Sequence, residues 1–136
     1  MEYSLENNDG IYIGMGSKDI VFRSNDTNKP AKYYFNSTPA HKKYPIEKID
    51  IKKAQPAKMG SLNDSNERTI YKYIHPEGVK SCQLVMGLTI LEPGSVWNTM
   101  PCHTHDRRME VYMYFGMEKD SLVYHFMGEP EETRHI

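Results

Sequence analysis

Short runs of apolar and aromatic residues, separated by polar stretches and by glycine and proline, recur along this chain. The runs that have the composition or alternation of β-strands are residues 11–13, 20–22, 32–36, 71–74, 82–91, 111–115 and 121–127. Apolar residues nowhere keep the i, i+3, i+4, i+7 spacing of an amphipathic helix for roughly a dozen residues. The pattern therefore predicts an all-β protein, built as a sandwich or a small barrel.

The distribution of strand signals divides the chain into three regions. Residues 1–38 contain short strand candidates around a glycine turn, whereas residues 39–67 are polar and contain three prolines. This second region is typical of an extended connector rather than of packed structure. Residues 68–136 carry the strongest strand signals.

Composition and charge exclude several classes of protein. Seventeen Lys and Arg against eighteen Asp and Glu give a net charge of −1, so the chain is no generally basic nucleic-acid binder. No segment has the ~20 apolar residues of a membrane helix, and the acidic, polar start is unlike a secretory signal. Two cysteines are too few for a disulfide scaffold. These features predict a cytoplasmic globular protein that binds neither nucleic acid nor membrane.

The apolar content is low for a self-contained domain. Hydrophobic residues make up 38% of the chain, and its mean hydropathy is −0.70. We therefore expect either long polar loops or a core that is completed by residues outside this sequence.

A cluster of metal-ligand side chains precedes the run at 111–115. His103 and His105 are two positions apart, so both imidazoles point to the same side of an extended strand. Glu110 falls on the other side unless a turn or bulge intervenes, and the charged residues at 106–109 suit a turn. Three such ligands facing one cavity are typical of a transition-metal site with open positions, although two histidines near a glutamate also occur on ordinary surfaces. Their spacing suits zinc, iron, nickel and manganese alike.

Beyond this turn, the alternation of polar and apolar residues predicts two faces. Glu110, Tyr112 and Tyr114 lie on one face, and the apolar residues 111, 113 and 115 lie on the other, which is predicted to be core. Trp97, upstream of the cluster, is predicted to be a core anchor.

The pattern His103-x-His105-x4-Glu110, between Gly94 and Gly116, resembles the first metal-binding motif of cupins. Cupins are jelly-roll β-barrels, also called double-stranded β-helices. The stretches 97–112 and 127–135, together with Pro-Ala-His-Lys-Lys-Tyr-Pro at 39–45, closely resemble the 5-keto-4-deoxyuronate isomerase family of cupins. That family is also called 4-deoxy-L-threo-5-hexosulose-uronate ketol-isomerase.

The resemblance implies an incomplete cupin barrel that corresponds to an internal fragment of a longer enzyme. Residues 1–38 would be the closing strands of an N-terminal cupin half, and residues 39–67 the connector. Residues 68–136 would be the first part of the metal-binding C-terminal half.

The resemblance also implies an activity and a cofactor. The family isomerises 5-dehydro-4-deoxy-D-glucuronate to 3-deoxy-D-glycero-2,5-hexodiulosonate in uronate and pectin breakdown, by proton transfer through a metal-stabilised enediolate. It implies one zinc ion per chain, held by His103, His105 and Glu110, and a homo-oligomeric enzyme. The family's fourth ligand is a histidine in a later motif, which neither His125 nor His135 matches.

Candidate substrate-binding residues lie beside the expected metal ligands. A sugar-acid carboxylate requires a cation, ideally a guanidinium, and Arg107 and Arg108 are the nearest candidates. Consecutive arginines in a turn are also common on surfaces, and Tyr112 and Tyr114 either line the pocket or pack. His125 is predicted to be a hydrogen-bonded core or pocket histidine. The catalytic base is not identified.

Two other functions stay open. The chain is alternatively a truncated, catalytically inactive cupin fragment or a non-catalytic module that binds a metal or a sugar acid. A metal-dependent dioxygenase on the same scaffold would require redox-active iron.

Cys102, next to His103, is predicted to pack rather than to bind metal.

Overall fold

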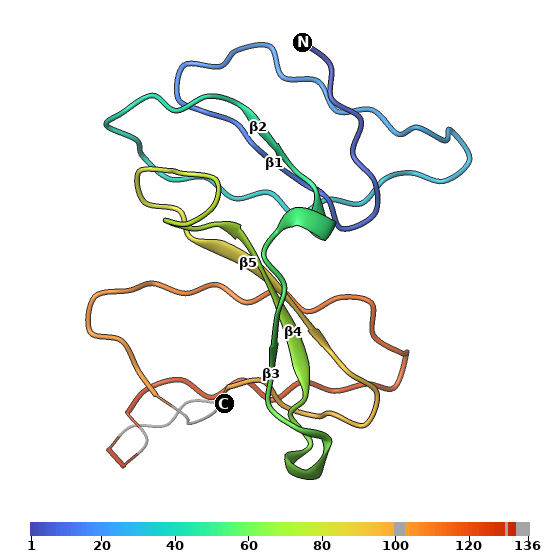
Figure 1. Ribbon diagram of the computed structural model, residues 1–136, viewed down its shortest axis with the longest axis vertical. Coiled ribbons are helices and arrows are strands. Elements are labelled where there is room, and N and C mark those ends of the chain that lie inside the picture. The colour runs from blue at the N-terminus through green and yellow to red at the C-terminus, as the bar shows by residue number, and fades with distance from the viewer. Residues whose placement is uncertain (100–102, 130, 133–136) are drawn as a thin grey trace. The chain divides into compact units, whose positions relative to one another are not determined.

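The computed structural model describes residues 1–99, 103–129 and 131–132 (Figure 1). The chain divides into two compact units. The first unit is Met1–Trp97 and the second is Asn98–Ile136. The described secondary structure consists of antiparallel strands and two 3-10 helices of three residues each. The prediction of an all-β protein is therefore confirmed, and the described strands form open sheets rather than a closed barrel, as expected of an incomplete cupin fold.

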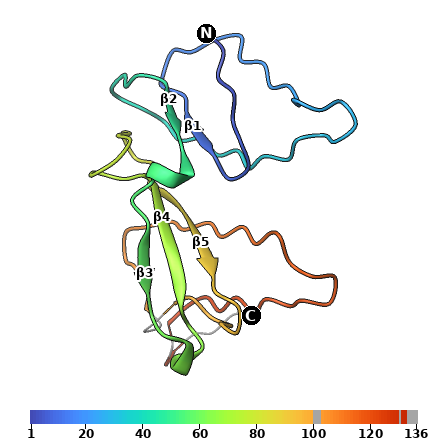
Figure 2. The same ribbon diagram turned by 45° about the vertical axis from the view of Figure 1, so that its right-hand side comes forward.

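All the strands of the described part belong to the first unit, where they form two sheets (Figure 2). Strand β1 (Gly10–Tyr12) pairs with β2 (Glu47–Ile49). A second sheet has the order β3 (Ala57–Met59), β4 (Arg68–Ile74) and β5 (Met86–Leu91). Neighbouring strands are antiparallel in both sheets.

Strand β4 is the centre of the larger sheet because its sequence suits a strand that is paired on both sides. Arg-Thr-Ile-Tyr-Lys-Tyr-Ile is rich in β-branched and aromatic residues, which pack well on a pleated surface. The pairing with β5 runs from Arg68 opposite Leu91 to Ile74 opposite Met86, with an irregularity between Lys72 and Ile74. Next to this irregularity, Lys72 N donates to Ala54 O over 2.7 Å.

The connection from β3 to β4 depends on one glycine. Gly60 has a φ of 77°, and a Cβ atom there would lie 2.3 Å from the backbone oxygen of Asn66. Ser61 then begins the short 3-10 helix Leu62–Asp64, because its hydroxyl accepts a hydrogen bond from Asp64 N. This tight turn sets the register of β3 against β4.

The core of the first unit is small. Its buried apolar residues are between 4% and 6% exposed: Tyr12, Ile49, Ala54, Tyr73 and Ile74. The hydroxyl of Tyr73 donates to the backbone oxygen of Asn8. Burial, together with the charge of Asp9 and the neighbouring Tyr71, raises the pKa of Tyr73 to about 12. The core therefore packs side chains of β1, β2 and β4 together, and Tyr73 also bonds β4 to the segment before β1.

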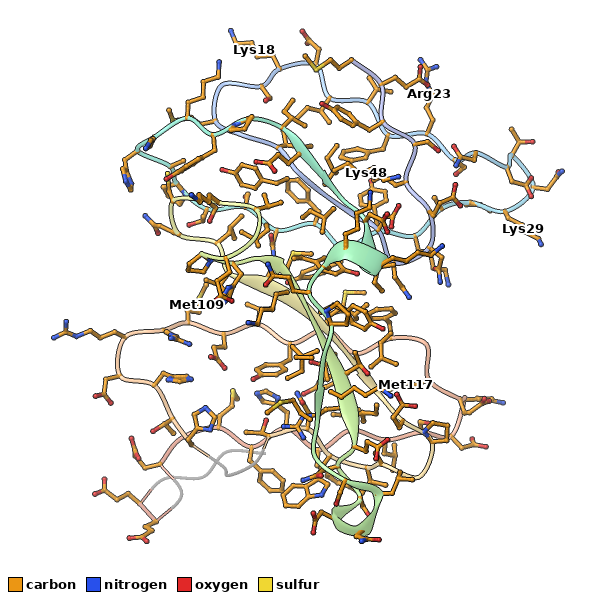
Figure 3. All side chains as sticks on the ribbon, in the orientation of Figure 1. Lys18, Arg23, Lys29, Lys48, Met109 and Met117 are labelled. Carbon is orange, nitrogen blue, oxygen red and sulfur yellow. The ribbon has the colours of Figure 1, made fainter. Side chains whose placement is uncertain are left out.

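A buried carboxylate joins the N-terminal segment to β2. Asp9 accepts hydrogen bonds from the backbone N–H groups of Glu6 and Ile51 and forms an ion pair with Lys48 over 3.1 Å. Lys48 projects from β2 (Figure 3). Burial opposes ionisation of Asp9, but the hydrogen bonds and the lysine outweigh it and hold the pKa of Asp9 below its ordinary value.

Three predictions about the first unit are wrong. The region 39–67 is not an unpacked connector, because it contains β2 and β3 and the buried Ile49 and Ala54. The runs at 20–22 and 32–36 are not strands; Phe22 and Tyr33 stack on each other and are exposed. Trp97 is no core anchor, since it is 40% exposed and its indole N–H donates to the backbone oxygen of Asp64. The assignment of the regions to cupin halves stays a prediction.

The second unit holds no strand among its described residues. The described residues of the runs at 111–115 and 121–127 form no strand, although Met127 takes part in an isolated bridge, and the side chains of both runs are exposed. Residues 111, 113 and 115, predicted as core, are between 48% and 67% exposed. In the part of the chain that the structure describes, no helix is long and apolar enough to cross a membrane.

Candidate metal centre

The candidate site lies in the second unit, on residues 103–114 and at His125. Met109 and Met117, labelled in Figure 3, mark the ends of the segment that carries Glu110, Tyr112 and Tyr114. A turn at 106–107 precedes this segment. The site is thus built from a turn and from extended chain without ladder hydrogen bonds.

The three predicted metal ligands lie next to one another. The rings of His103 and His105 meet edge to face, with their centroids 4.8 Å apart. Across the turn, His105 Nε2 lies 3.3 Å from Glu110 Oε1. The predicted turn is therefore confirmed, and it brings the glutamate back to His105.

The two imidazoles and the carboxylate are donor types that suit zinc, but the described side chains are not gathered around one point. Among the described residues, no group of three or more His, Cys, Asp or Glu side chains is arranged to hold a metal ion. In a tetrahedral zinc site, bonds of about 2.0–2.2 Å place neighbouring donor atoms about 3.3 Å apart. The separation of His105 Nε2 from Glu110 Oε1 matches this spacing. Two imidazoles and one carboxylate are also the donor types of open zinc sites.

Tyr112 holds the second oxygen of the glutamate. Its hydroxyl donates to Glu110 Oε2 over 3.1 Å. Burial raises the pKa of Tyr112, and the hydrogen bond to Glu110 and the charge of this carboxylate raise it further. A hydrogen bond with Thr99 lowers this pKa, but by less. The phenol therefore keeps its proton at neutral pH and remains a donor to the carboxylate.

His125 joins this group from the following segment. Its Nδ1 lies 3.1 Å from the hydroxyl of Tyr114, and its ring centroid lies 5.3 Å from that of Tyr112. The two tyrosine rings stack with centroids 6.3 Å apart. The prediction that Glu110, Tyr112 and Tyr114 share one face is confirmed by these contacts.

The role of His125 differs from its prediction in one respect. It is hydrogen-bonded, as expected, but it is exposed and belongs to no core. Its approach to Tyr112 depends on how the chain returns after residue 116, which side-chain alternation along one segment does not reveal. The chain turns at residues 119–120, where Ser121 N donates to Glu118 O.

The predicted arginines stand apart from this group. Arg107 and Arg108 are exposed, and neither makes a hydrogen bond or an ion pair with any other residue that the structure describes. Their contact with a substrate stays a prediction. Cys102 and His135 lie outside the described residues.

Comparisons with known proteins agree with the resemblance seen in the sequence. The family model described as "KduI/IolB family" matches residues 2–135. A protein of Caldicellulosiruptor bescii named 4-deoxy-L-threo-5-hexosulose-uronate ketol-isomerase is 67% identical over 135 residues, which are 99% of this chain and 49% of the relative. Proteins of the same name from Halalkalibacterium halodurans and Lachnoclostridium phytofermentans are 58% and 62% identical, with 99% and 98% of this chain and 49% of each relative covered.

The chain spans about half the length of the curated relatives it matches. Within that half the match is nearly continuous, because the family model covers the chain from residue 2 to residue 135. It therefore includes both units and every residue of the candidate site. The chain belongs to the KduI/IolB family.

Proposed function

We propose that this chain supplies the metal-binding part of a zinc-dependent ketol-isomerase of uronate metabolism. The reaction would convert 5-dehydro-4-deoxy-D-glucuronate to 3-deoxy-D-glycero-2,5-hexodiulosonate during the breakdown of pectin and related polymers. The family match and the names of the relatives support a ketol-isomerase. The observation that carries the zinc site is the approach of His105 to Glu110 across the turn.

Some residues of the candidate site would bind the metal, and others would contact the substrate. His103, His105 and Glu110 would hold one zinc ion per chain, and the bound ion would supply Lewis-acid stabilisation of negative charge on the substrate oxygens. Tyr112, through its hydroxyl, keeps the carboxylate of Glu110 turned toward His105. Tyr114 is 45% exposed, so its ring would contact a ligand bound on the face that it shares with Glu110 and Tyr112.

The two arginines would recognise the acid group of the substrate. Arg107 and Arg108 sit in or next to the turn between the histidines and Glu110, and both are exposed. A guanidinium binds a carboxylate through two parallel hydrogen bonds, which fixes orientation as well as charge. One of them would therefore anchor the uronate carboxylate while the reacting end of the sugar lies at the metal.

Metal stoichiometry tests this proposal directly. The purified chain is compared with the double variant His103→Ala/His105→Ala by inductively coupled plasma mass spectrometry, after removal of loosely held ions. We expect close to one zinc per chain, and none in the double variant because two of the three donors are lost. A wild-type chain without zinc would contradict the proposed site. An assay of uronate isomerisation then tests the reaction.

Solvent exposure favours a second candidate function, a non-catalytic module that binds a metal or a sugar acid. The side chains of His105 and Glu110 are 31% and 40% exposed. Exclusion of water strengthens the electrostatic interactions that stabilise charge during a reaction, and exposed side chains lack this advantage. Zinc binding without isomerisation of the uronate would support this second function.

The expected homo-oligomer and cytoplasmic location stay predictions.

A further inference from the structure

The carboxylate of Glu110 is held at both of its oxygens. Oε1 lies 3.3 Å from His105 Nε2, and Oε2 accepts a hydrogen bond from Tyr112 over 3.1 Å. A glutamate side chain has several rotatable bonds, and their immobilisation costs entropy when a metal binds. A hydrogen bond that already fixes one oxygen reduces this cost and leaves the other oxygen directed at the neighbouring ligand.

Two rings from its own unit pack against Tyr112. Its ring stacks on that of Tyr114 at an interplanar angle of 20°. It also packs against the ring of His125 at 56°, and His125 is fixed by its hydrogen bond with the hydroxyl of Tyr114. These three aromatic side chains therefore contact one another, and Tyr112 is the one that hydrogen-bonds to Glu110.

We propose that Tyr112 is a positioning residue that orients the carboxylate of Glu110 for metal binding, and that Tyr114 and His125 hold Tyr112 in place. The inference rests on the proposed zinc site and adds to it residues that do not themselves bind the metal. Hydrogen-bond partners of metal ligands fix ligand orientation, and their loss commonly lowers metal affinity roughly 10–100-fold.

Zinc affinity tests the role of Tyr112 without any requirement for catalysis. The dissociation constant of the chain for zinc is measured by competition with a chromophoric chelator, for the wild type and for Tyr112→Phe. We expect roughly 10–100-fold weaker binding in the variant, because only the hydroxyl that holds Glu110 is removed. Tyr114→Phe is expected to weaken binding less, since it acts through Tyr112.

Tyr124→Phe is the matched control. Tyr124 lies in the same unit and is 70% exposed, and its hydroxyl makes no hydrogen bond with other described residues. The same loss of one hydroxyl is therefore expected to leave zinc affinity unchanged. If Tyr124→Phe weakened binding as much as Tyr112→Phe, the effect would be unspecific and the inference would be wrong.

A double-mutant cycle shows whether Tyr112 acts through the glutamate. In a Glu110→Gln background, where the metal-binding carboxylate is absent, Tyr112→Phe is expected to change zinc affinity little. An undiminished effect in that background would overturn the positioning role. Equal affinities of wild type and Tyr112→Phe would overturn it while leaving the zinc site intact. A wild-type chain that binds no zinc would overturn the site and the inference together.

Discussion

The two units of the chain are held together by different kinds of contact. In Met1–Trp97, strands pair through backbone hydrogen bonds around residues such as Tyr73, which is 4% exposed. In the described part of Asn98–Ile136, side-chain hydrogen bonds and ring contacts link exposed residues, and Tyr112 and Tyr114 are each 45% exposed. The unit with the sheets carries the fold, and the unit whose described residues form no strand carries the candidate chemistry.

Because the second unit is held by exposed side-chain contacts, a bound ligand is expected to contribute strongly to its order. A hydrogen bond between protein groups contributes only about 0.5–1.5 kcal/mol net, and exposed pairs lie at the low end. A ligand that binds only the ordered form adds stability that rises with its concentration relative to its dissociation constant. The second unit is therefore expected to gain more order from a bound metal than the first unit would.

Truncating one aromatic residue in each unit should give the largest difference between the units in the loss of unfolding free energy. Tyr73→Ala removes a buried ring from the core, and we expect a loss of about 3–5 kcal/mol in the free energy of unfolding. Phe115→Ala removes a ring that is 55% exposed, and we expect a change within about 0.5 kcal/mol. Urea unfolding, followed by tyrosine fluorescence and far-ultraviolet circular dichroism, measures both.

The two variants control for each other because both remove an aromatic ring. A loss for Phe115→Ala as large as that for Tyr73→Ala would show that Phe115 is buried in solution. The contrast between the units would then be wrong, and the prediction from alternation that residue 115 faces a core would be restored.

Sequence patterns predicted the strongly apolar strands and missed the charged ones. The runs at 11–13, 71–74 and 82–91 overlap β1, β4 and β5. Strands β2 and β3 are three residues long and each contains a lysine, so neither has a recognisable apolar run. Strand β2 forms because of a partner far along the chain, as Ile49 pairs with Gly10, and such pairing is not visible in local sequence. Strand β3 pairs with the adjacent β4 across the turn at Gly60.

The candidate site was more predictable than the fold around it. The spacing of two residues predicted the contact of His103 with His105, the charged turn that of His105 with Glu110, and alternation that of Tyr112 with Glu110. Their arrangement around one metal ion stays a prediction. These relations are local, since they involve residues close together in sequence. The contact of His125 with Tyr112 joins two segments, and it therefore required the structure.

Removing the buried carboxylate of the first unit should have an intermediate effect. Asp9→Asn loses the ion pair with Lys48 and leaves an amide N–H group facing backbone donors. We expect a loss of about 1–3 kcal/mol in the free energy of unfolding at neutral pH. Urea unfolding of the variant and the wild type measures it.

The pH dependence of this loss provides its control. Because folding lowers the pKa of Asp9 from its ordinary 3.8, its contribution is fully present above that value. The contribution is lost as the pH falls through the lowered pKa of the folded state. The difference between wild type and Asp9→Asn should therefore shrink in acid, and a difference that grew there would contradict the assigned contacts.

The smallest expected effect concerns the second unit and separates local order from global stability. Tyr114→Phe removes the hydrogen bond to His125, and we expect the free energy of unfolding of the first unit to change by less than about 0.5 kcal/mol. The ring nitrogen shifts of His125, measured by ¹⁵N NMR, should nevertheless change, because Nδ1 loses its hydroxyl partner. A shift of His125 without a change in unfolding would show that the candidate site orders independently of the sheets. Unchanged nitrogen shifts would mean that the tyrosine and the histidine are not bonded in solution, and the aromatic support of Tyr112 would then rest on ring stacking alone.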